Sequence, residues 1–161
     1  MKNNTRRSEG FIEVREEVSI AAGRLRVWQA LTRDLGQWWP DEFYMAPEST
    51  RFVLEPRLGG RWFEDSGGGE GLLWGTVMEI RKPRLLRLVG PLSLREGPGR
   101  FWVGHLFTAF SLEAKGAGTL LSVQEHAVGK VDDKLREALS SGWSFLLGKK
   151  LKAFAEGKPR R

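Results

Sequence analysis

The sequence predicts one α+β domain in which a mainly antiparallel sheet packs against a long C-terminal helix. Three observations predict this arrangement. Residues 11–20 alternate between apolar and polar side chains, as a half-buried strand does. Residues 49–126 form a series of strand-like segments separated by glycine- and proline-rich turns. Residues 132–155 carry apolar side chains at helical spacing over about six turns, and the sheet is the partner available to cover that apolar face.

The first predicted strand is followed by two short helices. The inward side of that strand carries Glu16 among apolar residues. Residues 23–32 have the apolar spacing of a short amphipathic helix. A second short helical turn carries Trp38 and Trp39 and ends at a proline. Along the chain, both tryptophans therefore lie between the first strand and the strands that form the rest of the sheet.

Six further strands are expected to complete the sheet. By alternation, Trp102, Leu106 and Phe110 share one face of the longest strand, and Leu121 and Val123 face the same way on the last one. These residues therefore belong to the side of the sheet that the C-terminal helix covers. The predicted strands are 51–55, 61–65, 72–80, 85–92, 101–112 and 119–126.

Length, charge and cysteine content narrow the class of protein. A chain of 161 residues fits one domain, and we expect a flexible N-terminal arm at 1–10, the domain at 11–156 and a basic tail at 157–161. The net charge of +6 is concentrated near the two ends, which argues against a nucleic-acid interface. The absence of cysteine excludes disulfides and thiolate metal sites. We expect a cytoplasmic protein without membrane insertion, because no secretory leader or spanning apolar segment is evident.

The sequence shows none of the familiar metal-binding, nucleophile or phosphate-binding motifs. The two histidines, His105 and His126, fall on different predicted strands without metal-ligand spacing. No serine lies in a nucleophile elbow, and the glycine run 67–69 precedes no Lys-Ser or Lys-Thr pair. We therefore expect no metal, no cofactor and no catalytic residue. Seven tryptophans against one tyrosine instead indicate a large aromatic core or an aromatic-lined cavity.

Two charged residues fall on faces that are otherwise apolar. Lys150 projects into the apolar arc of the long helix, and Glu125 follows Leu121 and Val123 on the inward side of the last strand. A charge at an apolar cavity must be paired or must reach water. One interpretation has them contact a polar group of a ligand, or act as acid or base on an enolisable substrate. The other has Lys150 extend to the cavity mouth and Glu125 bond a neighbour.

Five ordered motifs resemble the START-like (SRPBCC) superfamily and, within it, the activator of heat shock protein 90 ATPase homologue family. The resemblance runs from about Ile12 to Phe154. It implies a helix-grip fold, in which a curved antiparallel sheet wraps around the long helix and leaves a cavity between them. The motifs are Val27-Trp28-Gln29-Ala30-Leu31-Thr32, Trp38-Trp39-Pro40, Arg57-Leu58-Gly59-Gly60-Arg61-Trp62, Gly75-Thr76-Val77-Met78-Glu79-Ile80, and Gly118-Thr119-Leu120-Leu121 with Gly142-Trp143.

Such folds host several functions, so three hypotheses follow. The first is a non-enzymatic domain that binds an apolar or aromatic small molecule for sequestration or sensing. The second is an enzyme of the polyketide cyclase or aromatase type, and the third is a chaperone cofactor that acts through its protein surface. The residues expected to line the cavity are Trp38, Trp39, Trp62, Trp102, Leu106, Phe110, Leu121, Val123, Glu125, Leu139, Trp143, Leu146 and Lys150.

Overall fold

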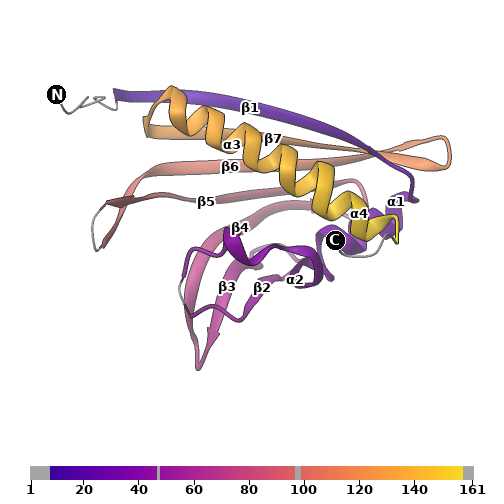
Figure 1. The fold of residues 1–161 in the computed structure, drawn as a ribbon, viewed down its shortest axis with the longest axis horizontal. Helices are drawn as coiled ribbons and strands as arrows, with labels where there is room; N and C mark the ends of the chain where they lie inside the picture. The colour runs from indigo at the N-terminus through magenta and orange to yellow at the C-terminus, as the bar shows by residue number, and fades with distance from the viewer. Residues whose placement is uncertain (1–7, 47, 97–98, 158–161) are drawn as a thin grey trace.

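One seven-stranded antiparallel sheet forms the body of the molecule, with strand order β1-β7-β6-β5-β4-β3-β2 (Figure 1). The computed structural model describes residues 8–46, 48–96 and 99–157, and the side chains of 8–9 and 93–103 lie outside that description. The strands are β1 (Ser8–Ile20), β2 (Arg51–Leu54), β3 (Arg61–Gly67), β4 (Glu70–Arg81), β5 (Leu85–Glu96), β6 (Gly99–Lys115) and β7 (Gly118–Val131).

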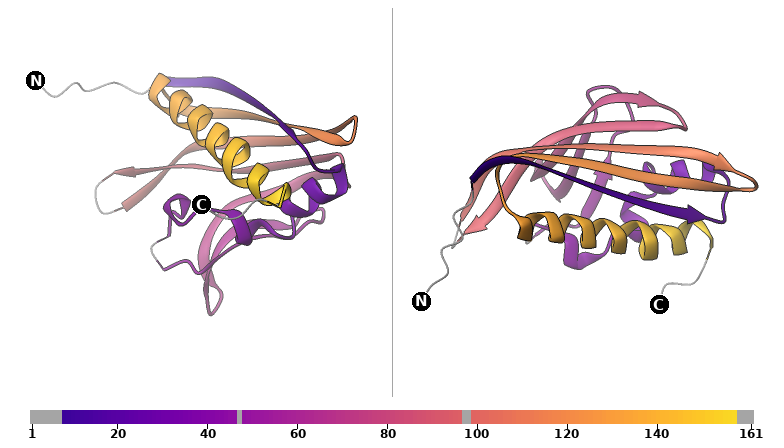
Figure 2. Two further views of the ribbon diagram at one scale, coloured as in Figure 1. Left: turned by 45° about the vertical axis from the view of Figure 1, so that its right-hand side comes forward. Right: turned by 90° about the horizontal axis from the view of Figure 1, so that it is seen from above.

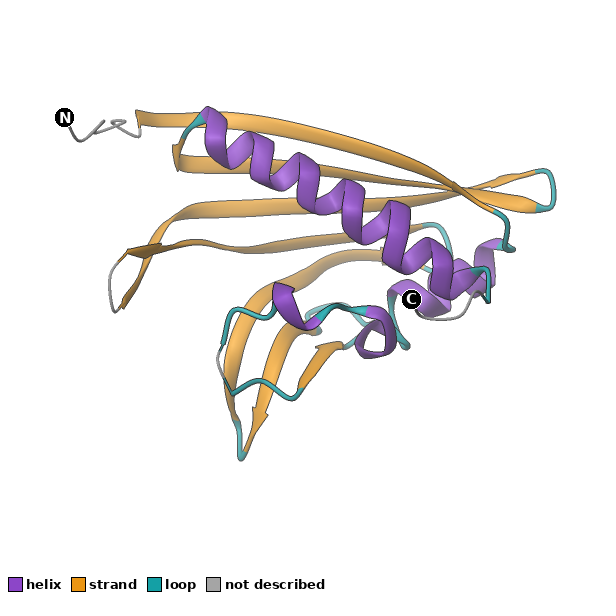
Figure 3. Ribbon diagram, viewed as in Figure 1, coloured by secondary structure: helices purple, strands orange, loops and turns teal. Residues whose placement is uncertain are grey.

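The helices gather on one face of this curved sheet (Figures 2 and 3). Helices α1 (Arg24–Leu31) and α2 (Leu35–Trp38) and a 3₁₀ turn (Asp41–Phe43) connect β1 to β2. The long C-terminal helix consists of α3 (Asp133–Phe145), a π-helical segment (Leu146–Leu151) and α4 (Lys152–Ala155). The expected α+β helix-grip fold, with two short helices after the first strand, is confirmed.

Strand alternation fixes which side chains face the helix. Along β7 every second residue from Thr119 to Ala127 is buried. Across the ladder Val123 lies opposite Phe110 of β6, and Glu125 lies opposite Thr108. Because side chains alternate with a period of two, this register puts all of these residues on the inner face of the sheet.

The long helix begins at a side-chain cap and changes its winding near its end. Asp132 caps it, because the backbone N–H of Leu135 donates a 2.8 Å hydrogen bond to the Asp132 carboxylate. In the π-helical segment the N–H of Lys152 bonds to the carbonyl of Leu147, five residues earlier. Such a turn inserts one extra residue, which is about 100° of helix rotation.

The core has two parts, one at each end of the sheet. The larger part contains Trp28, Phe110, Trp143 and Leu151 beneath the C-terminal half of the long helix. The smaller part consists of Ile12, Leu92, Ala127 and Val131. Within α3 Trp143 is the only fully buried residue, so the first turns of the helix do not fill the space between themselves and the sheet.

Candidate ligand-binding site

A cavity of about 280 Å³ lies between the first turns of α3 and the sheet. Among the described residues its walls are almost entirely apolar, and the two polar side chains there belong to Thr108 and Glu125. Met45 and Leu73 line it while remaining 39% and 44% exposed, so the cavity reaches the surface beside them. The lining residues are Trp39, Phe43, Met45, Trp62, Leu72, Leu73, Trp74, Leu88, Gly90, Pro91, Leu92, Leu106, Thr108, Glu125, Leu135, Ala138, Leu139, Gly142, Trp143 and Leu146.

Seven of the thirteen residues expected at a cavity are placed in its wall, and they come from β3, β6, β7, the long C-terminal helix and the segment after α2. The side chain of Trp102 falls outside the part of the chain that the structure describes. The other five line no part of this cavity. The seven wall residues are Trp39, Trp62, Leu106, Glu125, Leu139, Trp143 and Leu146.

Four of the five residues that do not line the cavity belong to the packed core. Phe110, Leu121 and Val123 are buried beneath the C-terminal half of the long helix. Trp38 is buried as well, and its indole N–H donates a 2.7 Å hydrogen bond to the carbonyl of Ala30. These four residues lie outside the wall of this cavity. For the three strand residues, alternation identifies the inner face of a strand but not which part of that face other side chains fill.

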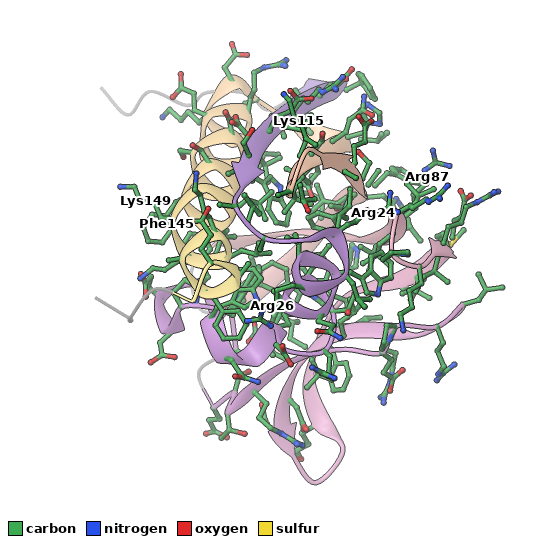
Figure 4. All side chains as sticks on the ribbon, turned by 90° about the vertical axis from the view of Figure 1, so that its right-hand side faces the viewer. Arg24, Arg26, Arg87, Lys115, Phe145 and Lys149 are labelled. Atoms are coloured by element: carbon green, nitrogen blue, oxygen red, sulfur yellow. The ribbon has the colours of Figure 1, made fainter. Side chains whose placement is uncertain are left out.

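The fifth residue outside the cavity wall is Lys150, and the π-helical segment explains its position. The extra residue in that segment rotates the following apolar face by one position, so Leu151 and Ala155 are buried and Lys150 is only half-buried. The Lys150 ammonium lies 5.3 Å from the centre of the Phe145 ring. The neighbouring Lys149 extends from the outer side of the helix, away from the sheet (Figure 4). Lys150 therefore lies outside the wall of this cavity.

Glu125 is the one titratable side chain in the wall of this cavity among the described residues, and it is 2% exposed. The Thr108 hydroxyl donates a 2.6 Å hydrogen bond to its Oε2. The indole N–H of Trp143 donates a 3.0 Å hydrogen bond to its Oε1. Burial raises the pKa of the Glu125 carboxyl above its ordinary value, and the two hydrogen bonds oppose that rise.

A second buried carboxyl group, that of Glu64, was not expected from the sequence. It is fully buried, and its two oxygens accept four hydrogen bonds of 2.7 Å each. Three come from the loop after the 3₁₀ turn, and the fourth comes from the indole N–H of Trp74 in the cavity wall. Alternation could have found it, because Glu64 follows Trp62 on the inner side of β3. The donors are the backbone N–H groups of Met45 and Ala46, the Ser49 hydroxyl and the Trp74 indole.

Aromatic rings form the end of the cavity nearest the 3₁₀ turn. Trp39 stacks on Phe52 at 4.2 Å between ring centres and meets Trp62 and Trp74 edge-on at 6.1 and 5.6 Å. The indole N–H of Trp39 is buried and has no hydrogen-bond partner within the described structure. Ring packing alone therefore orients Trp39, and this end of the cavity offers flat aromatic surface.

The remaining charged candidates lie away from the cavity. Glu16 accepts a hydrogen bond from Ser140, and Glu79 forms exposed ion pairs with two arginines. His105 is exposed, and His126 lies 3.5 Å from Glu13. Residues 8–46, 48–96 and 99–157 contain no cluster of three metal-ligating side chains and no helix long and apolar enough to cross a membrane. Glu16 and Glu125 therefore bond to different partners, and Lys150 lies against Phe145.

A curved sheet that grips one long helix over an apolar cavity defines a helix-grip domain of the START-like class. Protein MLL2253 of Mesorhizobium loti has this fold, with 20% identity, a TM-score of 0.66 and coverage of 92% of this chain and 100% of that one. The Aha1 dimer of Colwellia psychrerythraea is similar at 18% identity and a TM-score of 0.64, over 90% of this chain and 96% of that one. DynU16, described as a protein of the dynemicin biosynthetic locus, matches at 21% identity and a TM-score of 0.64, over 91% of this chain and 48% of that one.

The sequence itself identifies the family. Residues 21–156 match the profile of the activator of Hsp90 ATPase homolog 1-like proteins. This chain belongs to that family, as its five ordered motifs indicated. A comparison with curated proteins found no match.

Proposed function

We propose that this domain binds an apolar or aromatic small molecule in the cavity beneath α3 and acts by sequestration or sensing. The observation that carries the proposal is a cavity of about 280 Å³ with apolar walls and one buried pair of hydrogen-bonding side chains, Thr108 and Glu125. Ligand sites typically combine apolar walls with a few placed polar groups that orient the ligand. Four of the seven tryptophans belong to this wall, which suits a flat aromatic ligand.

The test is a titration with fatty acids, flavonoids and aromatic polyketides, followed by quenching of tryptophan fluorescence and by calorimetry. Leu139→Trp is designed to fill the cavity, since Leu139 lies in its wall. Glu137→Trp adds the same ring to an exposed position of the same helix and serves as the control. Binding by the wild type and the control, with at least a tenfold loss in Leu139→Trp, supports the proposal. Unchanged binding in Leu139→Trp, or no binding by any compound at micromolar concentration, contradicts it.

An enzyme of the polyketide cyclase or aromatase type is the second candidate, and the observation in its favour is Glu125. A buried carboxyl group with a raised pKa can transfer a proton to or from an enolisable substrate. The fold similarity to DynU16, from a biosynthetic locus, agrees with this candidate. Deuterium exchange at the methyl group of 2-acetylnaphthalene tests it. Accelerated exchange that is lost in Glu125→Gln would favour the enzyme, and exchange at the uncatalysed rate would favour simple binding.

A protein partner is the third candidate. Phe11, Phe107 and Val128 are 58%, 46% and 41% exposed on the outer face of the adjacent strands β1, β6 and β7. Exposed apolar side chains gathered on one face are typical of protein interaction sites. A chaperone of the heat shock protein 90 class is the partner that the family name suggests. An ATPase assay of such a chaperone with wild type and with Phe107→Ser tests this candidate, which requires stimulation by the wild type alone.

A further inference from the structure

We propose that Glu125 acts as a neutral hydrogen-bond donor in the cavity, and that the site selects uncharged aromatic ligands that carry a carbonyl oxygen. This inference rests on the proposed binding function and specifies its ligand class. It depends on three features of the site: the identity of the hydrogen-bond donors around Glu125, the lack of a charged partner for it among the described wall residues, and the shape of the wall.

The donors around Glu125 determine where its proton lies. An indole N–H can only donate, so the 3.0 Å contact with Trp143 requires Oε1 to be the accepting, carbonyl-type oxygen. The proton of the neutral acid is then on Oε2, beside the Thr108 hydroxyl at 2.6 Å. A hydroxyl can donate or accept, so Thr108 tolerates a proton on Oε2. While the Thr108 hydroxyl keeps its hydrogen bond to Oε2, the Oε2–H group is the donor left for one ligand oxygen.

The side chains that bond to Glu125 or lie directly opposite it carry no charge. Its cross-strand neighbours are Thr108 on β6 and Val14 on β1, and the helix supplies Trp143. The other wall residues within the described part of the chain are all uncharged. Two other carboxyl groups lie on the inner face of the sheet, and each has its own donors. That of Glu16, opposite Val123, accepts from Ser140, and that of Glu64 accepts from Trp74 and from the loop. Burial of an acid without a cation favours its neutral form, in agreement with the raised pKa of Glu125.

This arrangement distinguishes ligands by charge. A ketone oxygen accepts from Oε2–H and enters the cavity without losing a counter-ion. A ligand carboxylate is disfavoured, because its charge would be buried without a cationic partner. A ligand ammonium group would require Glu125 to be ionised, against the desolvation that the apolar wall imposes. The flat rings of Trp39, Trp62 and Trp143 suit an aromatic body for the same ligand.

Three naphthalenes of nearly equal size test the inference: 2-acetylnaphthalene, 2-naphthoate and 2-naphthylmethylamine. Calorimetry on the acidic side of the Glu125 titration is expected to show the ketone binding at least about tenfold more tightly than either charged compound. The Glu125→Gln variant keeps an accepting oxygen for Trp143 and a donor for the ligand. Its affinity for the ketone is expected to stay within about threefold of wild type, while Glu125→Leu loses about tenfold.

The wild type provides a further test that does not depend on any variant folding. Its affinity for the ketone should fall as the pH rises through the raised pKa of Glu125, and that of Glu125→Gln should not change. Preference for the amine, or wild-type affinity independent of pH in a folded protein, overturns the inference while leaving the binding function intact. Failure of all three naphthalenes to bind wild-type protein overturns the inference, whereas the binding function is contradicted only if the fatty acids, flavonoids and aromatic polyketides also fail to bind.

Discussion

The buried carboxyl group of Glu64 gives the most quantitative prediction for stability. In Glu64→Ala the donors of Met45, Ala46, Ser49 and Trp74 lose their acceptor. An unsatisfied buried donor costs about 1–3 kcal/mol. Three of the four lie on the loop beside Met45, which is 39% exposed, so water can replace part of what they lose. We therefore expect the free energy of unfolding to fall by about 2–4 kcal/mol, less than the sum over four donors.

The assay is urea denaturation at pH 7, followed by tryptophan fluorescence and far-ultraviolet circular dichroism. Glu70→Ala is the matched control, because Glu70 lies on the neighbouring strand with its side chain exposed. We expect that control to stay within about 0.5 kcal/mol of wild type. A Glu64→Ala variant that unfolds within 1 kcal/mol of wild type would refute the reasoning, since it would mean that the four hydrogen bonds contribute almost nothing net.

Three further predictions concern Glu125, Lys150 and Trp38. In the folded protein the Glu125 carboxyl keeps its proton above its ordinary pKa of 4.5, so wild-type stability should fall as the pH rises from 4.5 through the raised native pKa. Over that pH range the urea midpoint of Glu125→Gln should increase relative to that of wild type. A difference between the two midpoints that does not change with pH would disprove the burial effect. Lys150→Met should leave ligand affinity within about threefold in calorimetry, because Lys150 lies outside the cavity; a tenfold loss would place it at the ligand after all. Trp38→Phe removes the bond to Ala30 and should cost about 1 kcal/mol in urea denaturation with ligand affinity unchanged; an equal loss of binding would contradict the placement of Trp38 in the core.

The order of elements and the inner face of each strand could be predicted from the sequence. Alternation along β7 puts Leu121, Val123 and Glu125 inward, and all three are buried. Helical periodicity located the long helix, whose cap is at Asp132. These features depend on neighbouring residues along the chain, so a pattern in the sequence is enough to reveal them.

The exact composition of the cavity wall depends on contacts that no local pattern records. A π-helical turn leaves no sequence signature, and it alone moves Lys150 out of the apolar face and Leu151 into it. Which part of the inner sheet face stays open depends on how Trp143 packs against Phe110 and Trp62, which are far away in the sequence. Glu64 was predictable by alternation, but its four donors come from a loop and from another strand.

The most direct test of a ligand site beneath α3 is the position of a bound probe. In a complex with 2-acetylnaphthalene, intermolecular nuclear Overhauser effects should connect the naphthalene protons to the methyl groups of Thr108, Leu106 and Leu139, which all lie in the cavity wall. Contacts confined to the outer-face residues Phe107 and Val128, with none to the cavity wall, would contradict the account.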